Sequence, residues 1–115
     1  MTVVELTSLA TAEPFTTKDG STIRELHHTA EQSLAEASLP AGGSTTRHYH
    51  ALSEEIYFIL EGMAELEIDR ETRTVGPGDA ALIPAGSWHT IAATTELRLL
   101  CACSPPYSDA DTYLA

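Results

Sequence analysis

The segment RHYHALSEEIYFILEG, residues 47–62, contains the side chains best suited to chemistry in this sequence. His48 and His50 are separated by one residue, and two carboxylates, Glu54 and Glu55, follow shortly after them. Residues two apart on a β-strand project to the same face, so both imidazoles would point to one side. Two imidazoles and a carboxylate are typical of an open site for a divalent transition metal. Two surface histidines beside a loop are the alternative interpretation when this segment is taken alone.

A second segment, GPGDAALIPAGSWHT at residues 76–90, supports the interpretation that the histidines bind a metal ion. Pro84-Ala85-Gly86 predicts a tight turn, and His89 begins the strand that follows it. Trp88 precedes His89, so alternation sends the indole to the opposite face. The segment therefore supplies a third imidazole at the start of a strand.

The two segments together resemble the cupin superfamily. Its first motif is a glycine, five residues, H-x-H, three or four residues, glutamate, six residues and glycine. Its second is a glycine, five residues, P-x-G, two residues, histidine, three residues and asparagine. The matching positions span 42–62 and 78–93, and they are Gly42, His48, His50, Glu55, Gly62, Gly78, Pro84, Gly86 and His89. Ala93 stands at the asparagine position, a departure that affects local hydrogen bonding more than metal binding.

The resemblance implies an all-β, cupin-type jelly-roll β-barrel that forms one domain over residues 1–115, with an N-terminal arm at about 1–20. It implies one divalent transition metal ion, which is Mn, Fe, Ni, Zn or Cu because imidazole and carboxylate donors accept all of these. The spacing to Gly62 selects Glu55 as the carboxylate ligand, and strand alternation sends Glu54 to the other face. The implied metal ligands are His48, His50, Glu55 and His89.

The pattern of the whole chain agrees with an all-β fold. Turn residues recur at short intervals, as at Asp19-Gly20, Gly76-Pro77-Gly78 and Pro105-Pro106, which favours a sandwich or barrel of short strands. Residues 32–39 have helical propensity, but they span about two turns and lie between strands, so we predict a strand there. A short helical turn is expected only over residues 109–114, with Ser108 as its cap.

The run at residues 56–60 is apolar at every position, so both faces of this strand should be covered. One face has the barrel interior. The other face needs a second layer or a second subunit. A chain of 115 residues has little spare length for a second layer, so a homodimer is the simpler solution. Alternation from Glu55 and His89 predicts that the substrate pocket is lined by Tyr57, Ile59, Ile91 and Cys101. Tyr57 is the candidate catalytic residue, and packing in the core is its alternative role.

Charge and composition exclude several classes of partner. Seventeen acidic residues against six basic ones give a formal net charge of −11. The six basic residues are scattered, which argues against nucleic acid and against an anionic membrane surface as partners.

The expected location is the cytoplasm, because the N-terminus lacks a secretory pattern. Cys101 and Cys103 are poorly placed to bridge each other on one strand, so free thiols are expected.

Three functions remain open from the sequence. The first is a metal-dependent enzyme that acts on a small oxygen-rich molecule, as an isomerase, lyase or cyclase on a sugar acid or a polyketide-like substrate. The second is an iron-dependent dioxygenase, and the third is a non-catalytic cupin that binds a small ligand. The barrel interior offers no obvious Lys or Arg by alternation, which weakens the case for a strongly anionic substrate.

Overall fold

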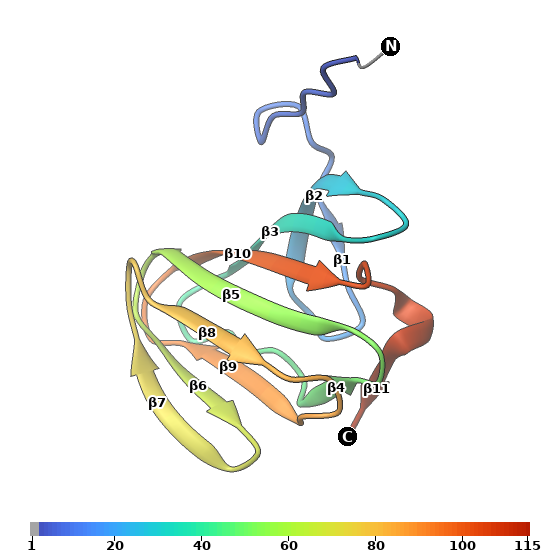
Figure 1. Cartoon of the computed structure of the whole chain (residues 1–115). Coiled ribbons are helices and arrows are strands. Elements are labelled where there is room, and N and C mark those ends of the chain that lie inside the picture. Colours follow the sequence, from blue (N-terminus) through green and yellow to red (C-terminus); the bar gives the residue numbers. More distant parts are fainter. Residues whose placement is uncertain (1–2) are drawn as a thin grey trace.

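Two antiparallel sheets face each other in the computed structural model, which describes residues 3–115 (Figure 1). Short strands between frequent turns form both sheets, and the expected all-β jelly roll is confirmed. The elements are β1 Phe15–Thr16, β2 Thr22–His28, β3 Ser33–Leu39, β4 His48–His50, β5 Glu54–Glu61, β6 Ala64–Ile68, β7 Glu71–Val75, β8 Ala80–Ile83, β9 His89–Ala93, β10 Leu97–Ser104, the 3₁₀ turn η1 Asp109–Asp111 and β11 Thr112–Leu114.

The strand order brings distant parts of the chain together. The six-stranded sheet has the order β1-β2-β3-β10-β5-β8, and the five-stranded sheet has the order β11-β4-β9-β6-β7. Strand β10 therefore lies between β3 and β5, and β9 lies between β4 and β6. This exchange of neighbours places the two histidine-bearing strands side by side in one sheet and β5 in the other.

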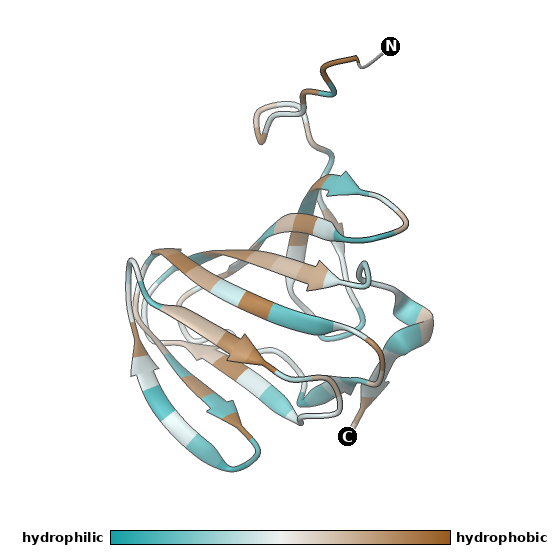
Figure 2. Cartoon of the chain, viewed as in Figure 1, coloured by the Kyte–Doolittle hydropathy of each residue, from teal (hydrophilic) through white to brown (hydrophobic). Residues whose placement is uncertain are grey.

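The hydrophobic core fills the space between the sheets, as strand alternation requires. On β5, Tyr57 and Ile59 are buried, while Ile56 and Phe58 remain partly exposed on the outer face. Apolar residues of β5 and β8 are visible along both strands in Figure 2. The prediction of two apolar faces is therefore correct for the strand, and the outer face is uncovered in the single chain.

Two turns show how local sequence fixes the barrel. Gly62 follows β5 with a φ of 90°, and a Cβ there would collide with the carbonyl oxygen of Glu96. Only glycine fits both conditions. The turn between β6 and β7 instead places Asp69 and Arg70 at φ values of 47° and 72°, a conformation that costs energy for residues with a side chain.

The predictions for β3 and for the C-terminal segment had different outcomes. Residues 33–39 form strand β3, as expected. At the C-terminus Ser108 does cap a helical turn through a hydrogen bond from the Ala110 N–H, but the turn ends at Asp111. The prediction of a turn through residue 114 is wrong, because residues 112–114 pair with β4 and form strand β11 instead.

An N-terminal arm was expected at about residues 1–20. Residues 3–14 contain no strand and extend away from the barrel in Figure 1, while Phe15 and Thr16 already pair with β2. Met1 and Thr2 lie outside the described residues.

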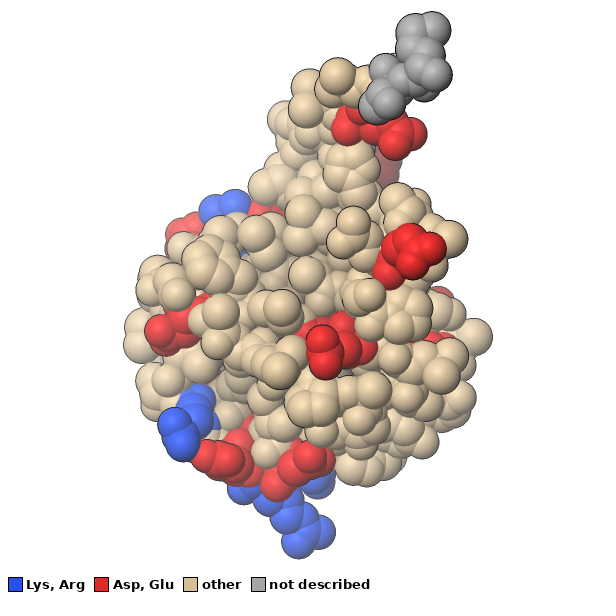
Figure 3. Space-filling view, in the orientation of Figure 1, with Lys and Arg blue, Asp and Glu red and all other residues tan. Residues whose placement is uncertain are grey.

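The surface reflects the acidic composition. Figure 3 shows acidic side chains spread over the visible face, and basic ones at its upper left and near its lower edge. Within residues 3–115 no helix has the length and apolar character needed to cross a membrane.

Candidate metal centre

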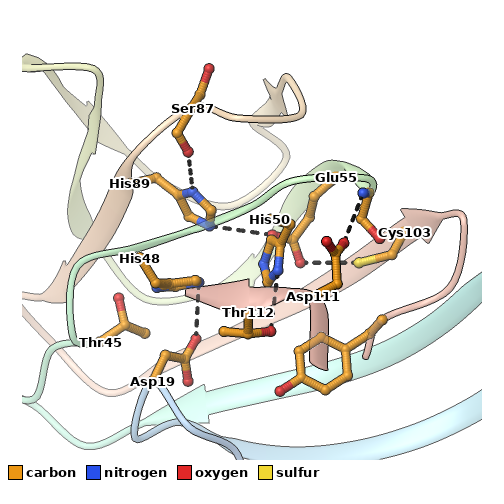
Figure 4. A network of polar contacts seen from close by, with 12 residues as sticks. Asp19, Thr45, His48, His50, Glu55, Ser87, His89, Cys103, Asp111 and Thr112 are labelled. Carbon is orange, nitrogen blue, oxygen red and sulfur yellow. Dashed lines mark hydrogen bonds and ion pairs between the residues drawn. The ribbon is translucent and has the colours of Figure 1, made fainter. Parts of the chain in front are cut away.

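The three motif histidines meet inside the barrel. His48 and His50 point inward from β4, with side chains 1% and 4% exposed. His89 begins β9 and is the register partner of His48 in the neighbouring strand. Glu55 is the second residue of β5 in the opposite sheet, so the carboxylate approaches the imidazoles across the core (Figure 4). Both sheets therefore contribute to one site.

Ring nitrogens of His48, His50 and His89 lie within 4.8 Å of one another, and all three side chains are buried. Glu55 approaches two of them, with its Oε1 at 3.5 Å from Nε2 of His50 and 3.4 Å from Nε2 of His89. Glu54, the adjacent carboxylate, is exposed on the outer face, as alternation predicted. The geometry thus separates the two glutamates in the way that the spacing indicated.

Each imidazole is oriented by a partner on its other nitrogen. Nδ1 of His48 lies 2.7 Å from the carbonyl oxygen of Thr46, and Nδ1 of His89 lies 2.9 Å from that of Ser87. A carbonyl oxygen only accepts, so both Nδ1 atoms carry the proton. In a neutral ring Nε2 then keeps its lone pair for a ligand bond.

His50 is held in a similar way by Thr112. The Thr112 hydroxyl donates to the carbonyl oxygen of Ser108 at 2.8 Å, so its oxygen is free to accept from Nδ1 of His50, 3.3 Å away. Thr112 belongs to β11, which pairs with β4. The C-terminal strand therefore fixes the orientation of the second motif histidine.

Asp111 fixes the loop between His50 and Glu55. Its Oδ1 accepts from the N–H groups of Ala51 and Leu52 at 3.0 Å, and its Oδ2 accepts from the Ser53 N–H at 3.0 Å. These bonds hold successive backbone donors of a loop that would otherwise need water. The loop returns the chain from one sheet to the other and sets the approach of Glu55.

Burial and mutual charge set the protonation of the cluster. Burial raises the pKa of the Glu55 carboxyl, but the neighbouring His50 and His89 outweigh it and lower that pKa to about 2. Burial and the neighbouring charge of His89 lower the pKa of His48. The pKa of His50 is raised, because Glu55 outweighs the effect of burial. An ionised carboxylate beside imidazoles is a donor set suited to a divalent cation.

Two buried atoms of this cluster have no hydrogen-bond partner among the described residues, Oε1 of Glu55 and Nε2 of His89. Their separation of 3.4 Å exceeds the usual 2.7–3.2 Å of an N–H···O bond. Buried polar atoms are nearly always paired, and leaving them unpaired costs free energy. These residues therefore fit a metal ion, which would bond to both atoms at once.

A cavity opens from the histidine cluster. Tyr57, Ile91 and Cys101 line it, together with His48, His50 and Glu55. Burial, and next the charge of Glu55, raises the pKa of the Tyr57 phenol well above its usual value, so its O–H is a hydrogen-bond donor at neutral pH.

Ile59 does not line this cavity, although alternation placed it there. Its side chain points inward and is 2% exposed, but it packs in the hydrophobic core. Ile59 lies four residues beyond Glu55 on β5, about 13 Å along the strand. Alternation therefore predicted correctly that Ile59 faces the barrel interior. The prediction that it lines the substrate pocket is wrong, because Ile59 lies too far along the strand from Glu55.

Several residues of the site were not identified from the sequence. The Cys103 thiol donates to Oε2 of Glu55 at 3.3 Å, and Oδ2 of Asp19 lies 3.5 Å from Nε2 of His48. Thr112 and Asp111 orient the ligand-bearing strand and loop. These residues come from separate segments, so no spacing rule connects them to the motifs. The Asp19-Gly20 turn was recognised only as a turn.

Comparison with known proteins agrees with this geometry. A family model described as a cupin domain matches residues 35–103. A relative from Methanocaldococcus jannaschii, itself uncharacterized, is 46% identical over 107 residues, which cover 87% of this chain and 86% of the relative. An uncharacterized protein of Streptomyces coelicolor is 36% identical over 72 residues, or 62% of this chain and 68% of that protein.

Solved structures share the fold at lower identity. KdgF from Halomonas sp. superposes with a TM-score of 0.84 at 21% identity, over 94% of this chain and 99% of that chain. The Streptomyces nucleoside dehydratase Pac13 superposes with a TM-score of 0.83 at 14% identity, over 99% of this chain and 92% of that chain. At this level of identity the superpositions establish the fold alone.

Proposed function

Because the chain belongs to the cupin family, we propose that it is a metal-dependent enzyme that acts on a small oxygen-rich molecule. His48, His50 and His89 hold one divalent transition metal ion, and Glu55 is the fourth ligand. The reaction is of the isomerase, lyase or cyclase type.

The observation that carries this proposal is the pair of buried, unpartnered atoms, Oε1 of Glu55 and Nε2 of His89. A site that served packing alone would pair them with a protein donor and acceptor. Instead the outer nitrogens of all three imidazoles are engaged, and the inner ones converge on each other and on the carboxylate.

When bound, the ion supplies a Lewis acid that polarises a carbonyl or hydroxyl oxygen. The chain itself holds the ion, excludes bulk water with the apolar walls of the cavity and presents the Tyr57 hydroxyl as a hydrogen-bond donor. Pac13 is named as a nucleoside dehydratase and has been solved with uridine. Dehydration is a lyase reaction on a small hydroxylated molecule, which favours this reaction class over a dioxygenase.

The metal site is tested by the metal content of protein purified without added metal. His50→Ala removes an inner ligand, and we expect its metal content to fall to a small fraction of the wild-type value. Glu54→Ala is the matched control, because Glu54 is adjacent in sequence to Glu55 but exposed on the outer face. Full metal content in His50→Ala, or loss in Glu54→Ala, would contradict the assignment.

The reaction class is tested separately with sugars, sugar acids, nucleosides and polyketide-like lactones in D₂O, monitored by NMR. Isomerase or lyase chemistry beside a carbonyl exchanges carbon-bound hydrogen for deuterium or produces water, and it proceeds under argon. Conversion only in air would support the iron-dependent dioxygenase. Saturable binding without turnover would support a non-catalytic cupin.

The assembly and location of the protein are part of the same proposal. The exposed apolar side chains of Ile56 and Phe58 on the outer face of β5 support a homodimer. Free thiols at Cys101 and Cys103 support a reducing compartment such as the cytoplasm.

A further inference from the structure

Asp19 is a second carboxylate at the histidine cluster, on the opposite side from Glu55. It lies in the turn between β1 and β2, and its backbone carbonyl accepts from the Thr46 N–H at 2.7 Å. Its Oδ2 lies 3.5 Å from Nε2 of His48, while Glu55 approaches the other two imidazoles. Figure 4 shows the carboxylate of Asp19 pointing at His48. The two carboxylates therefore flank the three histidines.

The side chain of Asp19 is held so that one oxygen remains available. Its Oδ1 accepts from the Thr17 hydroxyl at 2.5 Å, from the Ser21 hydroxyl at 2.8 Å and from the Ser21 N–H at 3.0 Å. No hydrogen bond from residues 3–115 ends on Oδ2. The side chain is only 13% exposed, and Asp19 lines the cavity. A carboxylate fixed by one oxygen presents the other at a defined position.

The charges around the cavity limit what it binds. The ionisable groups on its wall include the carboxylates Asp19, Glu25 and Glu55, and the wall contains no Lys or Arg. Glu25 is paired with His28 at 3.0 Å, which leaves Asp19 and Glu55 facing the cluster. Two carboxylates balance a divalent ion, so an anionic substrate would find no net positive charge to attract it.

We propose that Asp19 is the specificity-determining residue of this site, where its Oδ2 accepts a hydrogen bond from a hydroxyl of a neutral polyhydroxylated substrate. A hydroxyl donates well to an ionised carboxylate, whereas a substrate carboxylate would be repelled by it. On the same wall, the hydroxyls of Thr17 and Ser21 donate to Oδ1 of Asp19, and their oxygens keep lone pairs that can accept from further hydroxyls of such a molecule. This inference rests on the proposed function and narrows its substrate class to neutral sugars and related polyols.

The experiment compares two probes of the same ring shape, neutral D-glucose and anionic D-glucuronate, whose dissociation constants are measured by NMR titration of zinc-loaded protein. For the wild type we expect binding of D-glucose at least about tenfold tighter than that of D-glucuronate, the range of a charge-assisted hydrogen bond. Asp19→Asn should weaken D-glucose binding about tenfold and remove or invert the preference. Its metal content should stay at the wild-type level, because Asp19 acts on the substrate.

Two further variants separate position from charge. Ser21→Ala leaves the charge of Asp19 but releases its Oδ1 from the hydroxyl, so the preference should fall by a smaller factor. Glu25→Gln also removes one negative charge from the cavity wall, but at a carboxylate already paired with His28. It should change the dissociation constants of D-glucose and D-glucuronate by less than about threefold. If Asp19→Asn fails to fold, Ser21→Ala still tests the inference.

Outcomes distinguish this inference from the proposed function. An unchanged preference in Asp19→Asn with full metal content would overturn the role of Asp19 and leave the metal enzyme intact. Loss of metal in Asp19→Asn would make Asp19 a ligand and overturn its role as a substrate acceptor. Wild-type protein that binds neither probe, or prefers D-glucuronate, would also overturn it. Failure of the metal site itself appears independently, as unchanged metal content in His50→Ala.

Discussion

Glu36 and Glu55 are equally buried, at 5% and 4% exposure, but their surroundings differ completely. Glu36 lies on β3 on the outer face of the six-stranded sheet. Its Oε2 accepts from Nε and Nη2 of Arg98 at 3.0 and 2.7 Å, and Arg24 lies 3.9 Å from its other oxygen. Glu55 lies on the inner face, among imidazoles, and one of its oxygens has no hydrogen bond.

The difference teaches how to distinguish a structural buried charge from a functional one. Arg98 donates twice to one oxygen of Glu36, and the guanidinium of Arg24 lies 3.9 Å from the other oxygen, so two fixed cations already balance this carboxylate. The imidazoles of His48 and His89 near Glu55 instead bond through Nδ1 to backbone carbonyl oxygens. Nε2 of His89 and Oε1 of Glu55 are therefore left without a hydrogen bond. Unused bonding capacity in a buried cluster indicates a ligand, whereas a buried carboxylate that arginines already neutralise indicates a structural role.

The largest expected effect comes from exchanging the two carboxylates for amides. Glu55→Gln should lower zinc affinity by about 100-fold, because a metal ligand and its charge are lost. Glu36→Gln should leave zinc affinity within twofold of the wild type, since Glu36 faces away from the cluster. Competition with a chromophoric chelator measures both constants. Equal losses in the two variants would mean that the affinity reports general stability, and the comparison would fail.

The second effect is on the stability of the protein and concerns the structural carboxylate, Glu36. Arg98→Ala leaves Glu36 buried with only Arg24 near it, at 3.9 Å. We expect unfolding free energy in urea to fall by about 2 kcal/mol, less than for a fully buried pair because Arg98 is 38% exposed. The control is Arg73→Ala, which breaks the exposed pair with Glu71 and should cost less than about 0.5 kcal/mol. Loss of metal in Arg98→Ala would contradict the separation of the two regions.

The sequence was sufficient to predict one of these two regions. The spacing within each motif fixed the faces of His48, His50 and His89, because alternation on a strand depends only on local geometry. The same spacing distinguished Glu55 from Glu54. Gly62 could also be understood in advance as a turn residue, although its contact with Glu96 depends on the folded barrel.

The remainder of the site depends on long-range pairing that spacing does not encode. Cys103 and Thr112 reach the site only because β10 and β11 add to strands far earlier in the chain, and Asp19 reaches it from the distant turn between β1 and β2. The C-terminal segment shows the limit clearly. Its local propensity favoured a helical turn, but pairing with β4 gave residues 112–114 an extended conformation. Tertiary contacts overrode a weak local preference there.

The third effect is a difference in pH dependence. The pKa of Glu55 is lowered from 4.5 to about 2 in the folded protein, so its ionised form contributes stability that is fully present above pH 4.5. That contribution is lost as the pH falls toward 2. In EDTA, the wild type should lose about 2 to 3 kcal/mol more than Glu55→Gln over this window, measured by urea unfolding at several pH values. Parallel curves for the two proteins would contradict the ionised state assigned to Glu55.

The smallest expected effect concerns the two faces of β5. The inner face is covered by the core, but Ile56 and Phe58 on the outer face are 44% and 38% exposed, and Leu82 of the neighbouring β8 is 54% exposed. Ile56 and Leu82 are register partners, so these side chains form one continuous apolar patch. A second copy of the chain would cover it. Phe58→Ser should raise the dissociation constant of the homodimer about tenfold, because aromatic side chains contribute strongly to interfaces.

Sedimentation equilibrium over a dilution series measures this constant, with Leu114→Ser as the matched control. Leu114 is 44% exposed, similar to Phe58, but it lies on β11 in the other sheet. Phe58→Ser should keep its metal content, because its side chain points away from the histidines on a strand whose inner face carries Glu55. A wild type that stays monomeric at hundreds of micromolar would contradict the homodimer, and equal weakening by both variants would place the interface elsewhere. Dimerisation that fails only in Phe58→Ser would show that β5 serves assembly with one face and the metal site with the other.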